Sequence, residues 1–309
     1  MPKPRPDIVV VGSSNTDFII RLKRIPKIGE TILGGEFMTA AGGKGANQAV
    51  AAARAGGTVC FVARVGQDLF GDQAIAGFVH EGIDVTHVRR DRHSASGAAL
   101  IFVSQTGENS IAVAGGANNR LTPADVRRAR AVLTQAKVLL MQLETPLEAI
   151  EAAARSAASK GAVVILNPAP ARSLPNRLLR QLSILTPNES EAELLTGVRL
   201  NGLSAAEKAA QKLLYRGVPT VVLTMGAKGA LVATEDGSEL IRGFAVKAVD
   251  TTAAGDVFNG ALAVALTEGH PLRQAVRFAN AAAAISVTCR GAQPSAPQRR
   301  SIEKLLKEH

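Results

Sequence analysis

Short runs of β-branched residues alternate along this chain with alanine-rich stretches of helical length. A strand that is apolar throughout must be covered on both faces, and such strands interleaved with helices are typical of a parallel sheet. We therefore expect an α/β fold, a three-layer sandwich with a mainly parallel central sheet. The predicted strands cover 8–12, 58–66, 137–142, 162–167, 182–188 and 220–226, and helices are expected at 45–55, 69–81, 123–135, 146–159, 204–216, 255–268 and 271–288.

Two regions, 15–40 and 97–114, interrupt this alternation with turn-rich or alternating sequence, and the second reads as two strands around a QTGEN turn. We expect antiparallel additions at one edge of the main sheet, which together make a small β lid subdomain. No linker, low-complexity tract or internal repeat divides the chain, so residues 1–309 are expected to form a single domain with that lid.

Composition narrows the class of protein further. No apolar run approaches the roughly 20 residues of a membrane span, and no long apolar segment precedes the first strand, so we expect a cytoplasmic protein without a membrane contact. Two cysteines without a CxxC pair indicate neither a disulfide framework nor a zinc site. The net charge of +10 suggests nucleic acid as a minor alternative, but the arginines are scattered and Trp is absent, which favours solvated helix faces.

The stretch VDTTAAGDVFNGALAVAL, residues 249–266, places Asp256 where an apolar helix is predicted to begin. Unpaired N–H groups and the positive end of the helix dipole gather there, so the carboxylate is expected to stay ionised at neutral pH. The N–H groups of Ala253, Ala254 and Gly255 could hold a phosphoryl group, while Asp256 takes a proton from an attacking hydroxyl. The alternative is an ordinary helix cap.

A second glycine-rich element, AGGKGANQAVAAARAGG, carries Gly42, Gly43 and Gly45 into a helix of small residues. Backbone can approach a polar ligand closely there, and Asn47 can point its amide at it. The element has neither the GxxxxGK[ST] spacing of a Walker loop nor the GxGxxG spacing of a dinucleotide site. A glycine-rich packing turn remains the alternative.

Together these elements resemble the ribokinase family of sugar kinases, and the resemblance spans nearly the whole chain. The motifs that carry it, in order, are GSSNTD, AGGKGANQA, GGAN, LLMQLETPLE, TPNESEAE, TMGAKGA, DTTAAGDVFNGA and NAAAAISVTCRGAQPS. The wider family often has Gly at the position of Ala253, but the backbone N–H donors survive that change. The resemblance implies the ribokinase-like fold and ATP-dependent phosphorylation of D-ribose at O5.

The resemblance also implies roles for individual residues. Asp256 corresponds to the catalytic base, with Ala253, Ala254 and Gly255 forming the anion hole beside it. A carboxylate can accept two sugar hydroxyls, which suits acidic residues in such a site. A salt-bridged surface Asp17 and a solvated Lys44 are the alternatives. The implied sugar-binding residues are Asn15, Asp17, Gly43, Lys44, Asn47, Glu144 and Asp256.

The nucleotide and magnesium residues are implied in the same way. Glu191 corresponds to a position near Mg²⁺, where a carboxylate can act through one of the waters that the ion keeps. Each of these residues also has an alternative explanation. The acids at 189, 191 and 193 could be only dipole partners at a helix start, the TMGAKG turn could be only a tight turn after a strand, and Asn280 could be a helical residue that faces solvent. The implied nucleotide-binding residues are Asn188, Thr224, the turn from Gly226 to Gly229, Gly255 and Asn280.

A potassium site is also implied by the resemblance. Asp250 would contribute a carboxylate, and backbone carbonyls would tolerate side-chain change, so a cysteine among the ligands does not weaken the inference. Oxygen-only ligands suit such a cation. The alternative is an Asp that ends a strand with a local turn bond. The implied potassium ligands are Asp250, Thr252, Ser286, Cys289, Gly291 and Ser295.

Three functional alternatives stay open. A sister kinase for 2-deoxyribose, fructose or a nucleoside such as adenosine would share Asp256 and the ATP elements. A non-catalytic sugar sensor would share the fold, and a nucleic-acid-binding protein would exploit the charge. In the resembling family the lid pairs two subunits, so the partners expected are ATP, a pentose and a second copy of the chain, and the ions expected are Mg²⁺ and K⁺.

Overall fold

The computed structural model of the protein describes residues 5–309. Two sheets hold its thirteen strands: β1 (Ile8–Val11), β2 (Asn15–Leu22), β3 (Glu36–Gly42), β4 (Val59–Gly66), β5 (Asp84–Asp91), β6 (Gly97–Ser104), β7 (Asn109–Ala114), β8 (Val138–Met141), β9 (Val163–Leu166), β10 (Ile184–Leu185), β11 (Thr220–Thr224), β12 (Gly229–Thr234) and β13 (Gly237–Arg242). The main sheet has the order β13-β12-β11-β10-β9-β8-β1-β4-β5. Every pair from β11 across to β5 is parallel, whereas β12 and β13 are added antiparallel.

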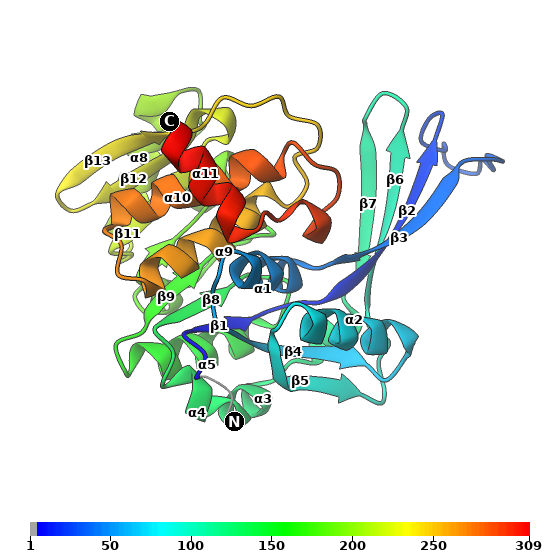
Figure 1. The fold of residues 1–309 in the computed structure, drawn as a ribbon, viewed down its shortest axis with the longest axis horizontal. Coiled ribbons are helices and arrows are strands. Elements are labelled where there is room, and N and C mark those ends of the chain that lie inside the picture. The colour runs from blue at the N-terminus through cyan, green and yellow to red at the C-terminus, as the bar shows by residue number, and fades with distance from the viewer. Residues whose placement is uncertain (1–4) are drawn as a thin grey trace.

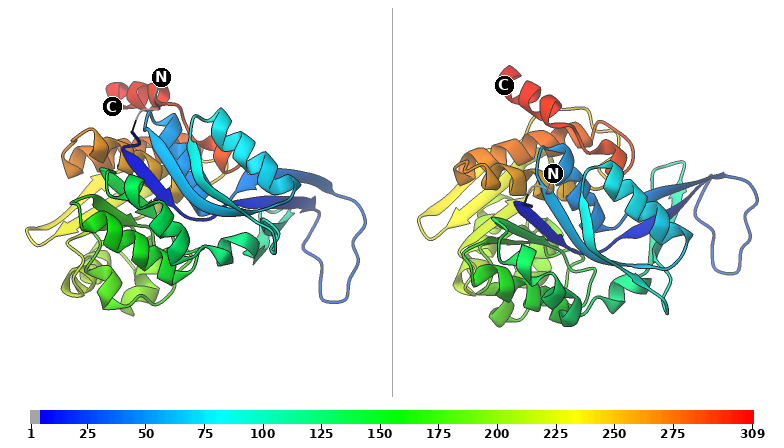
Figure 2. Two further views of the ribbon diagram at one scale, coloured as in Figure 1. Left: turned by 90° about the horizontal axis from the view of Figure 1, so that it is seen from below. Right: turned by 60° about the horizontal axis from the view of Figure 1, so that its bottom comes forward.

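Helices cover both faces of this sheet (Figures 1 and 2). They are α1 (Lys44–Arg54), α2 (Leu69–His80), α3 (Pro123–Arg128), α4 (Arg130–Leu133), α5 (Leu147–Ala158), α6 (Asn176–Leu179), α7 (Glu189–Thr196), α8 (Leu203–Tyr215), α9 (Ala254–Thr267), α10 (Leu272–Ser286) and α11 (Arg299–Glu308), with 3-10 turns η1 (Gly116–Arg120), η2 (Gly226–Lys228) and η3 (Gln293–Ser295).

The alternation of side chains along β1 shows why two helical layers are needed. Ile8 and Val10 pack into an apolar core with α1, α2, α9, α10 and α11, whereas Val9 and Val11 pack into a second core with α3 to α8. All four side chains are fully buried. A strand that is apolar on both faces is stable only between two such layers, and the predicted α/β sandwich is confirmed.

All six predicted strands lie in the parallel part of the main sheet. One predicted helix is interrupted: the segment 123–135 forms α3 and α4, because the chain tightens at Ala129, whose N–H bonds to the carbonyls of both Asp125 and Val126. Four further elements were not predicted from the sequence: the edge strand β5, the β12–β13 hairpin, the short helix α6 and the last helix, α11.

The two exceptional regions form a separate four-stranded sheet, which we call the lid, with the order β3-β2-β6-β7. The expected additions to one edge of the main sheet are therefore wrong in position. The lid is also not wholly antiparallel, since β2 and β6 run parallel. Both strands continue from carboxyl ends of the parallel strands β1 and β5, so they leave the body in one direction (Figure 1). Asp17 of β2 pairs with Ala99 of β6, and Ala99 with Val113 of β7, which places these three on one face.

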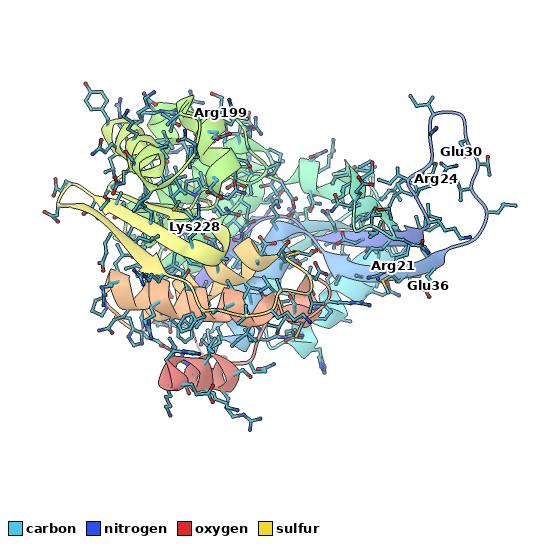
Figure 3. The ribbon with its side chains drawn as sticks, turned by 90° about the horizontal axis from the view of Figure 1, so that it is seen from above. Arg21, Arg24, Glu30, Glu36, Arg199 and Lys228 are labelled. Atoms are coloured by element: carbon cyan, nitrogen blue, oxygen red, sulfur yellow. The ribbon has the colours of Figure 1, made fainter. Side chains whose placement is uncertain are left out.

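Charged side chains are distributed over the lid and the body. Arg21, Arg24, Glu30 and Glu36 lie at the lid, where Arg24 Nη1 donates to Glu30 Oε2 at 2.6 Å, while Lys228 lies on the body (Figure 3). Within residues 5–309, no helix combines the length and the apolar character that crossing a membrane requires.

Candidate active site

The start of α9 is built around a left-handed residue. Ala253, at φ 59°, is the only non-glycine residue with positive φ in the described chain, 5–309. The first helical hydrogen bond runs from the N–H of Val257 to the carbonyl of Ala253 at 2.9 Å. The N–H groups of Gly255 and Asp256 thus have no helical acceptor, and a Cβ at Gly255 would meet no atom within 4 Å. The N–H of Ala254 differs, since it bonds to the carbonyl of Thr251 at 3.3 Å.

Two amide side chains from α1 hold the carboxylate of Asp256. Asn47 Nδ2 donates to Oδ2 at 3.0 Å, and Gln48 Nε2 donates to Oδ1 at 2.9 Å. The helices approach closely one turn further along α9, where a Cβ at Gly260 would lie 2.7 Å from Ala51 Cβ. Glycine at this position therefore lets α1 bring both amides to the carboxylate.

Burial and charge oppose each other at this carboxylate. Asp256 is only 6% exposed. Burial raises its pKa, whereas Lys44 and the amides of Asn47 and Gln48 lower it, with a raised pKa as the net result. The prediction that a helix start alone keeps Asp256 ionised was incomplete, because it left burial out. A carboxylate with a raised pKa is a stronger base than an ordinary exposed one.

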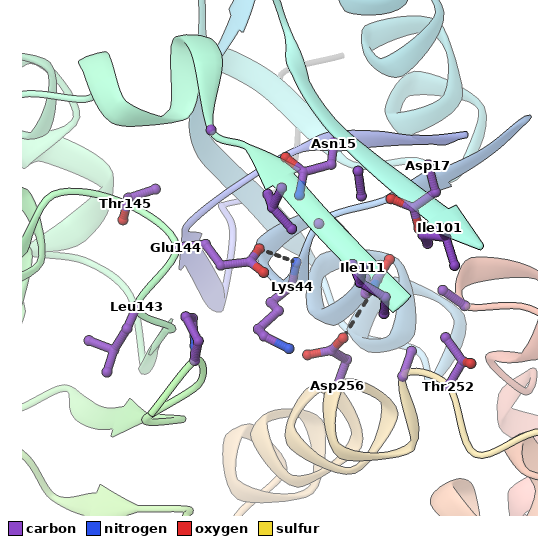
Figure 4. Close-up of a pocket in the computed structure, with 18 of the residues that line it drawn as sticks. Asn15, Asp17, Lys44, Ile101, Ile111, Leu143, Glu144, Thr145, Thr252 and Asp256 are labelled. Atoms are coloured by element: carbon purple, nitrogen blue, oxygen red, sulfur yellow. Dashed lines mark hydrogen bonds between the residues drawn. The ribbon is translucent and has the colours of Figure 1, made fainter. Parts of the chain in front are cut away.

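Lys44 lies among the acids of the site rather than in solvent. Burial would lower the pKa of its ammonium, but the carboxylates of Asp256, Glu144, Glu191 and Asp17 raise it. Figure 4 shows the side chain reaching from the start of α1 toward Asp256. The solvated lysine considered from sequence is thereby excluded, and the ammonium of Lys44 lies among several acids of the site.

A cleft of about 600 Å³ lies between the body and the lid. All seven residues predicted to bind sugar line it, and Thr252 and Ala253 join them from the start of α9 (Figure 4). The lid contributes apolar side chains to the same cleft, which the sequence analysis did not name. The lining comprises Asn15, Asp17, Gly43, Lys44, Asn47, Ala99, Ile101, Ile111, Val113, Gly115, Asn119, Leu143, Glu144, Thr145, Pro146, Pro170, Arg172, Thr252, Ala253, Asp256 and Ala292.

Hydrogen bonds orient Glu144 on the body side of the cleft. Its Oε2 accepts from Ser13 Oγ at 2.5 Å and from the backbone N–H of Lys44 at 3.0 Å, so Oε1 remains for a ligand. Ser13 Oγ also accepts from the N–H of Gly45 at 3.3 Å. The carboxylate is thus tied to the glycine turn before α1.

Asn118 orients Asn15 in a comparable way. Asn118 Nδ2 donates to Asn15 Oδ1 at 2.7 Å, while its Oδ1 accepts from the N–H of Ser14 at 2.9 Å. Because the oxygen of Asn15 is engaged, its Nδ2 is the group left to donate into the cleft. The GGAN motif contains Asn118, but the motif alone did not predict this orienting role.

Two further groups in the cleft, the amide oxygen of Asn47 and the carboxylate of Asp17, are available as acceptors. Asn47 Oδ1 is buried and has no hydrogen-bond partner within the described chain. Burial, together with the nearby Glu144, raises the pKa of Asp17 to about 6, although Lys44 lowers it. Buried acceptors without protein donors are costly unless a ligand supplies hydroxyl groups. The surface ion pair considered for Asp17 does not describe this half-buried residue.

Asn188 and Thr224, two of the predicted nucleotide residues, lie beyond this cleft, at the carboxyl ends of β10 and β11. Asn188 caps α7: Glu191 N–H donates to Asn188 Oδ1 at 2.8 Å, and Asn188 N–H donates to Glu191 Oε2 at 2.9 Å. A β-bridge places Asn188 beside Thr224. Burial and Asp256 raise the pKa of Glu191, against the lowering effects of Asn188 and Lys44, and a raised pKa results.

The glycine turn after β11 contains two residues with positive φ. Gly226 and Gly229 have φ values of 57° and 102°, and a Cβ at Gly229 would lie 2.2 Å from the carbonyl oxygen of Ile241. Asn280 is buried rather than solvent-facing, and its Nδ2 donates to the carbonyls of Ile241 at 3.0 Å and Arg242 at 3.4 Å. Its amide nitrogen therefore secures α10 to the end of β13.

Asp250 joins the loop before α9 to the loop after α10. Its Oδ1 accepts from the N–H and the hydroxyl of Thr252 at 2.9 and 2.6 Å, and its Oδ2 accepts from the N–H of Gly291 at 2.9 Å. Burial would raise the pKa of Asp250, but these hydrogen bonds lower it. Ser286 at the end of α10 and Ser295 in η3 use their hydroxyls to donate to backbone carbonyls, and Cys289 between them is exposed.

Comparisons with known proteins agree with this geometry. The family model "pfkB family carbohydrate kinase" matches residues 5–299. The chain is 47% identical over 305 residues to the ribokinase of Haemophilus influenzae, covering 99% of each, and 39% identical over 299 residues to the deoxyribokinase of Salmonella typhimurium, covering 96% of this chain and 97% of that one. The structure of Arabidopsis thaliana ribokinase complexed with ribose and ATP matches with a TM-score of 0.91 and 36% identity, covering 98% of this chain and 99% of that one.

Proposed function

The chain belongs to the pfkB family of carbohydrate kinases, and from this premise we propose that it transfers the γ-phosphoryl group of ATP to O5 of D-ribose. The observation that carries the proposal is the position of Asp256. Its carboxylate lines the cleft that holds the acceptors for hydroxyl groups, and it lies one residue from the open N–H group of Gly255. An acceptor hydroxyl and a transferring phosphoryl group can therefore meet at this residue.

In the proposed step Asp256 accepts the proton of the O5 hydroxyl as this oxygen forms a bond to the γ-phosphorus. The bond from the γ-phosphorus to the bridging oxygen breaks, and ADP leaves with that electron pair. The positive end of the α9 dipole and the N–H of Gly255 stabilise the charge on the phosphoryl oxygens. Ala253, in its left-handed conformation, turns the chain so that the helix starts toward the cleft.

The sugar is held by acceptors and donors from both sides of the cleft. Asp17, Asn47 Oδ1 and Glu144 Oε1 accept from sugar hydroxyls, whereas Asn15 Nδ2 donates. Carboxylates bound to hydroxyl groups form charge-assisted hydrogen bonds, which are stronger than neutral ones. Apolar lid residues such as Ile101 and Ile111 would cover the sugar and exclude water.

ATP is assigned to the carboxyl ends of β10 and β11, where Asn188, Thr224, Gly226 and Gly229 gather, with Asn280 securing the adjacent backbone. Ligands of open α/β sheets bind outside these strand ends. Glu191 fits a water-mediated magnesium site, because it is buried and, within residues 5–309, its carboxylate accepts hydrogen bonds from Asn188 alone. Mg²⁺ bound there would neutralise charge on the nucleotide phosphates.

The loops around Asp250 fit a potassium ion. The carboxylate, whose pKa is lowered, and the adjacent backbone of Thr252, Ser286, Cys289, Gly291 and Ser295 offer oxygen ligands. K⁺ bound there would add positive charge beside the anion-binding start of α9. Asp250 itself holds the two loops together through Thr252 and Gly291.

A homodimer formed through the lid is part of the proposal. The lid exposes apolar side chains on both faces: Ile111 and Val113 face the cleft, whereas Phe37 and Leu100 alternate to the outer face and are 65% and 53% exposed. A sheet with two apolar faces needs a second cover, which another lid can supply. The cytoplasmic location stays a prediction.

The test measures ADP release from MgATP with D-ribose, 2-deoxyribose, fructose and adenosine, each in potassium and in sodium. We expect the highest kcat/KM on ribose and a lower rate in sodium. If only 2-deoxyribose is phosphorylated, the substrate is 2-deoxyribose rather than ribose, as the name of the Salmonella typhimurium relative would suggest. No turnover on any acceptor would contradict the kinase proposal, and light scattering at the assay concentration tests the dimer.

A further inference from the structure

A network of buried polar side chains, joined by hydrogen bonds, lies behind Asp256, away from the cleft. Its members come from α1, from α9 and from the residues directly after β8, β9 and β10, which are neighbours in the main sheet. None of them lines the cleft. The members, with their exposed fractions, are Gln48 0%, Gln142 0%, Asn167 7%, Thr186 1% and Asn259 1%.

In the first part of the network, each hydrogen bond has a defined donor and acceptor. Gln142 Nε2 donates to Gln48 Oε1 at 2.5 Å, so the amide nitrogen of Gln48 must face the opposite way. That nitrogen donates to Asp256 Oδ1 at 2.9 Å and to Asn167 Oδ1 at 3.2 Å. Both protons of the Gln48 amide are thus used, and its orientation toward the carboxylate is fixed.

The second part leads back to the start of α9. Asn167 Nδ2 donates to the carbonyl of Thr186 at 3.0 Å, and Thr186 Oγ1 donates to Asn259 Oδ1 at 2.6 Å. Asn259 Nδ2 then donates to the carbonyl of Gly255 at 2.8 Å. The peptide that joins Gly255 to Asp256 is therefore held at the carbonyl by Asn259, while Gln48 holds the carboxylate.

Five polar side chains in a core are costly, because apolar residues could fill the same volume and because Gln142 Oε1 is left without a hydrogen-bond partner within residues 5–309. The network touches the site at two atoms only, Asp256 Oδ1 and the carbonyl oxygen of Gly255. We propose that Gln48 is a positioning residue that fixes the carboxylate of Asp256 for phosphoryl transfer, and that Thr186 and Asn259 fix the peptide of Gly255 beside it. This inference rests on the proposed kinase function with Asp256 as the base.

The first test is Gln48→Met, which removes the amide but keeps the length of the side chain. A hydrogen bond to a charged group is lost, so we expect kcat to fall about tenfold to a hundredfold, with KM for ribose within about threefold of wild type. The acidic limb of the pH profile of kcat should move to higher pH, since Gln48 lowers the pKa of Asp256. In an Asp256→Asn background the same change should alter the residual rate by less than about twofold, because the base is already absent.

A matched pair at the two ends of β10 separates positioning from stability. Thr186→Val removes the bond to Asn259, whereas Ser183→Ala removes an acceptor of the Val164 N–H at the other end of the strand. We expect comparable losses in urea midpoint, about a tenfold lower kcat for Thr186→Val, and wild-type kcat for Ser183→Ala.

Wild-type kcat and pH profile in Gln48→Met, or equal kcat losses in Thr186→Val and Ser183→Ala, would overturn the positioning role while the kinase function stands. Failure of the proposed kinase function would give different results. It would appear as no sugar phosphorylation by the wild type, or as full activity of Asp256→Asn, before any network variant is compared.

Discussion

Asp17 should make the ligand-free protein less stable at neutral pH than a version without this charge. Burial in the cleft, together with Glu144, raises its pKa from 3.8 to about 6. An Asp that is harder to ionise when folded than when unfolded favours unfolding once it is charged. Protonated Asp17 therefore favours the folded state over the unfolded state. This stabilisation is fully present below the unfolded pKa of 3.8 and is lost as pH rises through about 6.

The shift corresponds to about 3 kcal/mol at 1.36 kcal/mol for each pKa unit. Part of the side chain stays in water, so we expect about 2 kcal/mol for Asp17→Asn at pH 8. Urea denaturation of the ligand-free variant at pH 4, 5, 6 and 8 measures it. The gain in unfolding free energy should be close to zero at pH 4 and complete at pH 8.

The matched control is Asp236→Asn, which removes the same charge from the exposed β12–β13 turn. It should shift the free energy of unfolding by less than about 0.5 kcal/mol at any of these pH values. A variant at position 17 that is no more stable than wild type at pH 8, or equally stabilised at pH 4, would refute the reasoning. Ribose adds a second readout, since it should stabilise the wild type more than Asp17→Asn.

Three further predictions follow from the same geometry. Asp256→Asn should fold normally by circular dichroism yet lose several orders of magnitude, about 10³-fold or more, in kcat, and near-normal turnover would contradict Asp256 as the base. Gly260→Ala should separate α1 from α9, with a loss of about 1–3 kcal/mol in urea denaturation and a lower kcat, whereas Gly77→Ala in α2, where a Cβ meets no atom within 4 Å, should be neutral or stabilising. Phe37→Glu on the outer face of the lid should shift light scattering toward monomer at unchanged stability, and an unchanged dimer would place the interface elsewhere.

The main sheet could be predicted because its signal is local. β1, β8 and β9 are short, wholly apolar runs, and each can be recognised without knowing its neighbours. β5 carries a different signal: its sequence, DVTHVRRD, is polar because it is the edge strand of the sheet, and such a strand reads as loop. In the lid, β6 and β7 were predicted as two strands, whereas residues 15–40 were predicted only as part of a β lid. The pairing of all four strands depends on the direction in which β1 and β5 leave the body.

The cleft was predictable from short motifs to the extent that its residues lie within them. Asn15, Asp17, Lys44 and Asn47 come from two such motifs, and the structure brings them together with Asp256. The motifs do not predict how burial and neighbouring charges shift the pKa values of the site's carboxylates. The raised pKa of Asp256 follows from burial between α1 and α9, which no residue of its own stretch indicates.

Gln48 shows most clearly which residues of the site cannot be predicted from sequence, because its presence in a helix is explained by helix propensity alone. It lies one residue after Asn47 in an alanine-rich helix, where glutamine is a good helix former and needs no other reason. Its functional partners are 94 residues away at Gln142, 119 at Asn167 and 208 at Asp256. A side-chain amide acquires a direction only when its acceptor and donors are in place, so the role of Gln48 is a property of the assembled sheet ends, and only there does its full burial become informative.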